Sequence, residues 1–144
     1  MLRKDYAWVR EFELQFFATP TSVELIVEGN DENESIADEQ RTAFLQLGRA
    51  VHVAEREIYK HYLNVSDDYR ARFGADANSR MPRIQSQDEL GSLVKLTGII
   101  FPMVMTPGEV TTGFLLECSW EPEAGLGVKI TNGEVEVGGQ DILT

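Results

Sequence analysis

Cysteine is nearly absent from this chain, in which Cys118 is the single one among 144 residues. One cysteine excludes an intramolecular disulfide and fits a reducing compartment. Long apolar runs are absent as well, because the longest spans 99–105 and is too short to cross a bilayer. The basic start is not followed by the apolar segment of a secretory signal. We therefore expect a cytoplasmic protein that does not associate with membranes.

Positive charge is scarce, since 13 Lys and Arg stand against 24 Asp and Glu, for a formal net charge of −11. Nucleic acids and anionic lipid surfaces are bound mainly through clustered cations, so we expect neither as a partner. An acidic surface instead suits fast association with a cationic protein. We predict that such a partner binds the densest acidic cluster, which consists of Glu28, Asp31, Glu32, Glu34, Asp38 and Glu39.

The first half of the chain predicts a β-hairpin followed by a long helix. Apolar residues alternate with polar ones over 8–17 and again over 23–28, with a turn at 19–22 between them. Arg10 interrupts the apolar side of the first strand. A near capping box of Ser35 and Asp38 precedes a helix expected roughly from Ile36 to Leu63. Its apolar stripe is formed by Phe44, Leu47, Val51, Ala54, Ile58 and Tyr62. Gly48 within this helix suggests close packing against a strand.

The middle of the chain, 64–85, is the least ordered in pattern, with at most a short helix after Ser66. Irregular segments of this length are often functional or mobile. It is also the one locally basic stretch, and it contains Arg70, Arg72, Arg80 and Arg83.

The last third predicts strands. A capping box of Ser86 and Glu89 opens a short helix, and the apolar run 99–105 follows as a strand. Pro102 cannot donate to a ladder, so it predicts an edge position or a bulge. A return strand over 113–120 and a hairpin turning at Asn132–Gly133 complete the pattern. We predict a single α+β domain over residues 1–144, with a mostly antiparallel sheet of about six strands. One long amphipathic helix covers one face, and the order is β-β-α-(α)-β-β-β-β.

No residue pattern points to a metal ion, a cofactor or a catalytic centre. Cys118 falls between two apolar residues of its strand, which predicts a buried thiol rather than a nucleophile. His52 and His61 would lie on opposite sides of the helix, so they cannot share one ion. The acidic segment fails as a calcium-binding EF-hand loop, because Ile36 and Thr42 stand where glycine and glutamate are needed. We therefore expect no cofactor and no metal, and an enzymatic role is disfavoured.

The segment from Cys118 to Val128 reads Cys-Ser-Trp-Glu-Pro-Glu-Ala-Gly-Leu-Gly-Val, and Val137-Gly138-Gly139-Gln140-Asp141 follows a short hairpin. Both resemble the C-terminal motif of a group of uncharacterised bacterial domains, in which Trp and an acidic residue precede Glu-His-Gly-Leu-Gly-Val. The spacing of Ile58, Tyr59 and Tyr62 resembles the helix pattern of the same group. The resemblance implies an α+β domain without an established activity. Ala124 stands where these domains have His, so a catalytic role of that His would be lost here.

Three functions remain open on these residues. The first is a protein-binding domain, immunity-like or adaptor, that lacks catalytic activity. The second is a small-molecule-binding protein or hydrolase-like enzyme, with Trp120, Glu121 and Glu123 facing the basic residues Arg80 and Arg83. The third is a structural homo-oligomer that pairs through an edge strand near Pro102 or through the terminal hairpin.

Overall fold

The strands form one sheet whose spatial order is the order of the chain. The computed structural model describes residues 2–4, 7–29 and 35–143. The strands are β1 (Leu2–Lys4), β2 (Ala7–Phe16), β3 (Thr19–Glu28), β4 (Val94–Phe101), β5 (Thr111–Cys118), β6 (Leu126–Thr131) and β7 (Glu134–Gly138). All neighbours are antiparallel except β3 and β4, which are parallel because a helical crossover joins them. The α+β class and the mostly antiparallel sheet are confirmed, whereas the predicted order lacked the short β1.

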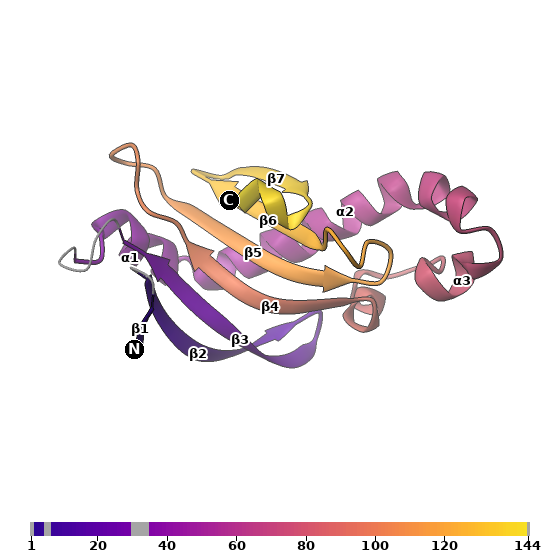
Figure 1. Cartoon of the computed structure of the whole chain (residues 1–144), viewed down its shortest axis with the longest axis horizontal. Helices are drawn as coiled ribbons and strands as arrows, with labels where there is room; N and C mark the ends of the chain where they lie inside the picture. Colours follow the sequence, from indigo (N-terminus) through magenta and orange to yellow (C-terminus); the bar gives the residue numbers. More distant parts are fainter. Residues whose placement is uncertain (1, 5–6, 30–34, 144) are drawn as a thin grey trace.

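The helical segments lie between β3 and β4 in the chain, and the longest of them runs behind the sheet (Figure 1). They are α1 (Asp38–Leu45), α2 (Leu47–Phe73), η1 (Gly74–Asp76), α3 (Ala77–Arg80) and η2 (Gln87–Ser92), and η3 (Gln140–Leu143) follows β7. The single predicted helix was wrong in two respects, because it breaks at Gln46 and continues to Phe73. Its apolar stripe carries on through Val65 and Tyr69, which pack against the core, so 64–73 is helical rather than irregular.

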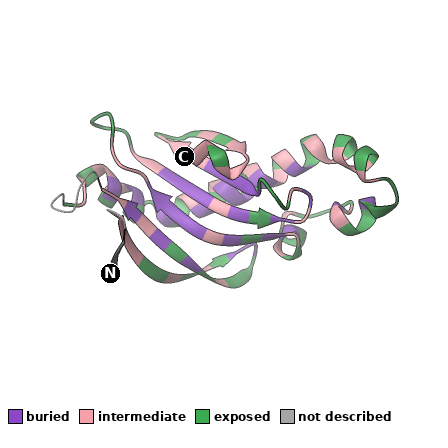
Figure 2. Ribbon diagram, viewed as in Figure 1, coloured by how far each residue is buried: buried purple, intermediate pink, exposed green. Residues whose placement is uncertain are grey.

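The core lies between the sheet and α2, where buried residues alternate along the strands (Figure 2). On the sheet side the fully buried side chains include Leu25, Ile99, Phe114, Leu116 and Val128. They meet the predicted stripe of α2, in which Ala54 and Ile58 are completely buried. Each such side chain contributes about 1.5–3 kcal/mol by leaving water. We call the opposite face of the sheet, which points away from α2, the outer face.

Pro102 does not mark an edge strand, contrary to the prediction. It follows the last residue of β4, which lies between β3 and β5 in the middle of the sheet. The bulge in this strand lies at Leu96–Gly98 instead. The buried side chain of Gln40 donates from Nε2 to the carbonyl oxygens of Glu28, Phe101 and Pro102, at 2.7, 3.1 and 3.1 Å. Pro102 thus supplies an acceptor where its missing N–H does no harm.

Gly48 was expected to mark close packing, but a Cβ at this position would meet no atom within 4 Å. We predict that Gly48→Ala raises the free energy of unfolding by up to about 1 kcal/mol, because glycine is the weaker helix former. Chemical denaturation of the two proteins measures this difference. A loss of stability would show that the first turn of α2 is more crowded than the structure indicates.

No helix in the described ranges combines the length and the apolar character that crossing a bilayer requires.

Candidate functional site

Two carboxylates of the predicted acidic cluster serve the fold. Glu39 Oε2 accepts a hydrogen bond from the Gly108 N–H at 2.9 Å, and this bond lowers the pKa of Glu39. Glu28 Oε1 accepts one from the Met103 N–H at 3.4 Å. The first bond ties the connection between β4 and β5 to the start of α1, and the second ties it to the end of β3. Asp38 is exposed in the first turn of α1, whereas Asp31, Glu32 and Glu34 lie outside the described residues.

Trp120, Glu121 and Glu123 do not share one environment. The Trp120 ring is buried and meets the Tyr62 ring edge-on, with 5.0 Å between centroids, so it is a core residue. Glu121 Oε2 accepts the Tyr69 hydroxyl at 2.9 Å, and this hydrogen bond, followed by burial, raises the pKa of Tyr69. Glu123 is exposed. In the described chain no ion pair joins Glu121 or Glu123 to Arg80 or Arg83.

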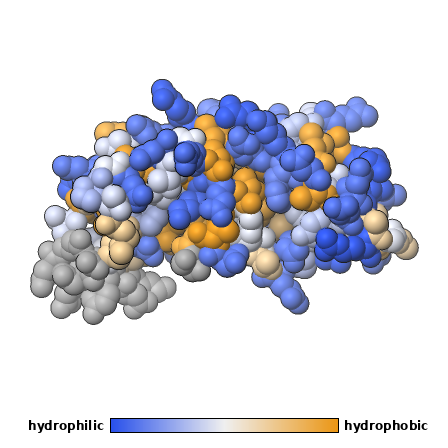
Figure 3. Space-filling model, turned by 90° about the horizontal axis from the view of Figure 1, so that it is seen from above, coloured by the Kyte–Doolittle hydropathy of each residue, from blue (hydrophilic) through white to orange (hydrophobic). Residues whose placement is uncertain are grey.

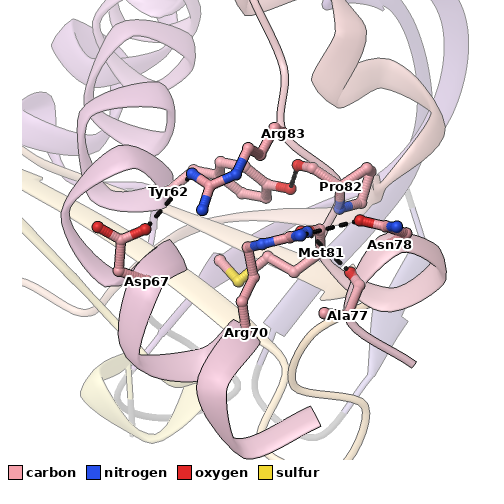
Figure 4. A network of polar contacts seen from close by, with 8 residues as sticks. All are labelled: Tyr62, Asp67, Arg70, Ala77, Asn78, Met81, Pro82 and Arg83. Atoms are coloured by element: carbon pink, nitrogen blue, oxygen red, sulfur yellow. Dashed lines mark hydrogen bonds and ion pairs between the residues drawn. The ribbon is translucent and has the colours of Figure 1, made fainter. Parts of the chain in front are cut away.

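The basic middle segment is tied into the fold by its own polar contacts (Figure 4). Arg70 donates from Nη1 to the Met81 carbonyl at 2.8 Å and from Nη2 to Asn78 Oδ1 at 2.9 Å. The Tyr62 hydroxyl donates to the Pro82 carbonyl, and burial raises the pKa of Tyr62 to about 12. Arg83 Nη1 forms an ion pair with Asp67 Oδ1 at 3.4 Å. These contacts brace 77–83 against α2, while the side chains of Arg72 and Arg83 stay exposed.

The thiol and the imidazoles offer no catalytic arrangement. Cys118 is buried on the α2 side of β5, and burial, the largest effect, raises its pKa to about 11. The thiol is therefore protonated at neutral pH and a poor nucleophile. Burial also lowers the pKa of His61, while His52 contacts Glu55. Among the residues that the structure describes, no three His, Cys, Asp or Glu side chains gather to hold a metal ion.

The main concave site is a cavity of about 860 Å³ that opens where β3 and β4 separate. These two strands pair only over Glu24–Val27 and Gly98–Phe101. The preceding halves, 19–23 of β3 and 94–97 of β4, diverge and form opposite walls of the cavity. Glu117 and Cys118 of β5, and Ser119 and Pro122 after it, line it further. We call this space the β3–β4 cavity.

Helix α2 holds the β3 wall in place through a buried carboxylate. Glu55 is 7% exposed, and its Oε2 accepts the Phe17 N–H at 2.6 Å. Phe17 and Ala18 form the two-residue turn between β2 and β3, with φ of 48° and 60°, the geometry of a tight hairpin turn. At the closed end, a Cβ on Gly91 would lie 3.1 Å from Thr19 Oγ1, so η2 packs directly on the hairpin.

The two strand walls offer peptide groups and hydroxyls. Because the two-residue turn makes Phe16 and Thr19 a hydrogen-bonded pair, alternation points the peptide groups of Pro20 and Ser22 toward β4. The ladder with β4 begins only at Glu24, beyond this part of β3. Hydroxyl side chains of Thr21, Ser92 and Ser119 also line the cavity. Sequence reasoning missed this site, because it depends on where a parallel pair starts.

The C-terminal motif has a packing role in this structure. Gly125 has a φ of 65°, and Gly127 faces η3 on the outer face of β6. Ala124 is exposed, and its carbonyl accepts the Gln140 N–H at 3.1 Å. The Gln140 side chain donates from Nε2 to the Leu116 carbonyl at 2.7 Å. The motif therefore seats η3 against the sheet.

The proposed homo-oligomer surface includes one edge strand that the structure describes. β7 pairs only with β6, and its Val135 and Val137 pack against the core while Glu134 and Glu136 are exposed. Figure 3 shows apolar side chains grouped near the middle of the face seen from above, where β7 lies in Figure 1. Charged residues on an edge oppose pairing between sheets. Oligomerisation through this hairpin stays a prediction.

Comparison with known proteins gives a family and no relative of known function. The family model described as "Domain of unknown function (DUF6985)" matches residues 1–144. No curated protein and no solved structure matches the chain.

Proposed function

The chain belongs to this family of domains of unknown function, and we propose that it is a non-catalytic protein-binding domain working in a reducing, cytoplasmic compartment. It takes a short extended segment of a partner protein into the β3–β4 cavity. The observation that carries this proposal is the early end of pairing between two strands that continue on both sides of a cavity of about 860 Å³. Open strand edges bind extended segments through main-chain hydrogen bonds.

One added segment is the occupant that we propose for the cavity. Neighbouring strands lie about 4.8 Å apart, so a segment between β3 and β4 needs walls about 10 Å apart. The cavity is bounded by the Glu24–Gly98 pair at one end and by the contact of Gly91 with Thr19 at the other. A bound segment therefore enters from the outer face and pairs over about four residues. The Ser22 N–H is the donor on the β3 wall, because Pro20 has none.

Carboxylates beside the cavity favour a cationic segment, because Lys95 in its lining lies opposite Glu117 on β5. Glu11 and Glu24 lie directly opposite each other on β2 and β3, and like charges in this position cost stability. Glu13 lies on the same side of β2, and Glu28 on the same side of β3. Glu28 connects this surface with the acidic cluster of the sequence, so Asp31, Glu32, Glu34, Asp38 and Glu39 remain proposed contacts. Lysine or arginine at alternate positions of the segment would face these carboxylates.

A peptide selection with a matched pair of variants tests the proposal. Ser92 lines the cavity and donates to the carbonyl of the residue three before it, and Ser79 makes the same type of bond away from the cavity. Both serines are exposed. Peptides enriched from a random displayed library on the wild-type protein should bind Ser79→Trp unchanged and Ser92→Trp at least about tenfold more weakly, because tryptophan fills the cavity.

Hydrogen exchange then locates the peptide. Binding should slow exchange of the Ser22 amide and of those amides in 94–97 that point away from β5, since they gain main-chain partners. High salt should weaken binding if cationic side chains face the outer carboxylates. Failure to enrich any peptide, or equal binding to both tryptophan variants, would contradict the proposal.

A small molecule in the same cavity is the second candidate. The cavity borders Ser119 and Pro122, which flank the segment of Trp120 and Glu121. A volume of about 860 Å³ lies within the range of ligand sites. Thermal stabilisation by a small polar compound, abolished in Ser92→Trp and kept in Ser79→Trp, would favour this function over peptide binding.

A further inference from the structure

Arg10 stands on the apolar side of β2, between residues that pack against the core. Trp8 and Phe12, its neighbours on this side of the strand, are both partly buried. Across the hairpin Arg10 pairs with Leu25, which is 1% exposed. In the described part of the chain the Arg10 guanidinium takes part in no hydrogen bond or ion pair, although the protein carries an excess of acidic residues. Arg10 is itself exposed, so its guanidinium is accessible to an anion from solution.

A groove of about 330 Å³ lies beside Arg10, between the β2–β3 hairpin and α1. Its floor consists of the buried side chains of Leu25, Val27 and Phe101. Its wall on α1 includes Phe44 and Leu45, which are 40% and 83% exposed. We call this space the α1 groove. Two of the four large apolar side chains exposed in the described chain line it, so its surface is unusually apolar.

The cationic groups of the α1 groove are two guanidiniums on opposite walls. Arg41 comes from α1 and Arg10 from β2. Arg41 makes one long hydrogen bond from Nε to the Ile36 carbonyl, at 3.5 Å, which leaves its terminal nitrogens available. The other polar side chain of the groove, Gln40, is fully occupied by backbone partners. The groove therefore presents an apolar floor with positive charge only at its rim.

We propose that the α1 groove binds an aliphatic monocarboxylate of medium chain length. Its carboxylate lies between Arg10 and Arg41, and its hydrocarbon chain covers Leu25, Val27 and Phe101. A planar guanidinium binds a carboxylate through two parallel hydrogen bonds. Because the two guanidiniums stand beside an apolar surface, an anion that also carries a hydrocarbon chain suits the groove. A volume of about 330 Å³ is at the lower end of ligand sites, which limits the length of the chain.

This site is separate from the one proposed for a partner segment. The α1 groove and the β3–β4 cavity share no lining residue. Ser92→Trp therefore leaves carboxylate binding unchanged, and the two proposals are tested independently.

Calorimetric titration with decanoate measures the affinity, with decanol as a neutral ligand of the same chain. Arg10→Gln and Arg41→Gln should each weaken decanoate binding about tenfold, because a hydrogen bond to a charged group is lost. Arg49→Gln on α2, away from the groove, serves as the control and should leave it unchanged. Decanol should bind the wild type about tenfold more weakly and lose nothing further in the two variants. Absence of saturable decanoate binding, or equal affinity in all three arginine variants, would overturn the proposal.

Two substitutions at Leu45 that introduce charges of opposite sign give a test that does not depend on the arginines. Because this side chain is 83% exposed, a charge there leaves the fold intact. Leu45→Glu should weaken decanoate binding and Leu45→Lys should strengthen it, both less so at high salt. Methyl NMR signals of Leu25 and Val27 should shift on binding, while those of Val135 and Val137 should not. Shifts confined to the latter pair would overturn the proposal, as would tighter binding of a peptide ending in leucine with a free carboxylate.

Discussion

Glu55→Leu is expected to lower the free energy of unfolding by about 3 kcal/mol, a large share of the stability of a domain this size. Glu55 is 7% exposed, and its carboxylate accepts the Phe17 N–H at 2.6 Å. Phe17 itself is 2% exposed, so no water replaces the lost acceptor. Leucine fills a similar volume but leaves a buried donor without a partner, which adds to the loss of a charge-assisted hydrogen bond.

Urea unfolding followed by circular dichroism measures this loss. Glu55→Gln keeps a neutral acceptor of the same shape and should lose roughly half as much. His52→Ala removes the other contact of Glu55, and because His52 is 84% exposed it should change stability by less than about 0.5 kcal/mol. A loss below about 1 kcal/mol in Glu55→Leu would mean that the Phe17 N–H finds another acceptor.

The same substitution also tests how the β3–β4 cavity is held open. Glu55 fixes the tip of the β2–β3 hairpin to α2, and the wall formed by 19–23 begins at that tip. In Glu55→Leu the amides of this wall should exchange faster with solvent than those of 24–27, which keep their ladder to β4. Equal acceleration over both ranges would indicate a global loss of stability instead.

Local periodicity predicted which helices and strands exist in this fold better than it predicted where they end and which elements they contact. The stripe through Ala54, Ile58 and Tyr62 and the turn at Asn132–Gly133 each depend on a few consecutive residues, and both are where they were expected. The continuation of α2 through Val65 and Tyr69 carried the same signal, but the polar residues between them favoured a loop. The break at Gln46 has no comparable signal in the chain.

Contacts between residues far apart in the chain could not be predicted from the sequence. Glu55 bonds a backbone group 38 residues away and Gln40 one 61 residues away, and nothing near either residue identifies that partner. From the helical pattern, Glu55 is predicted to lie beside the apolar stripe as an ordinary polar residue. The β3–β4 cavity has the same origin, because the point at which a parallel pair begins depends on the path of a whole crossover. Arg10, in contrast, was visible as an interruption of an apolar pattern, and this interruption is where the α1 groove lies.

Gly127→Ala is expected to cost about 2–3 kcal/mol, although it adds only one methyl group. A Cβ on Gly127 would lie 2.7 Å from the Gly139 carbonyl oxygen, a backbone atom that moves only if η3 moves. Gly138, its pairing partner on β7, provides a matched control, since a Cβ there would approach only the Ile142 side chain, at 3.1 Å. Gly138→Ala should therefore lose less, because a flexible side chain can shift.

Truncation after Gly138 separates a packing role of the motif from any other. If the collision with η3 causes the loss, Gly127→Ala should cost almost nothing in a chain that lacks 139–144, and a double-mutant cycle should assign the difference to η3. An equal cost in the full and shortened chains would place the strain inside β6. The first result would mean that Gly127 is needed because it lets the C-terminal η3 pack on the outer face of the sheet. A residue in the place of Ala124 would then be exposed beside that seat, held by its backbone carbonyl to Gln140 rather than directed into the β3–β4 cavity.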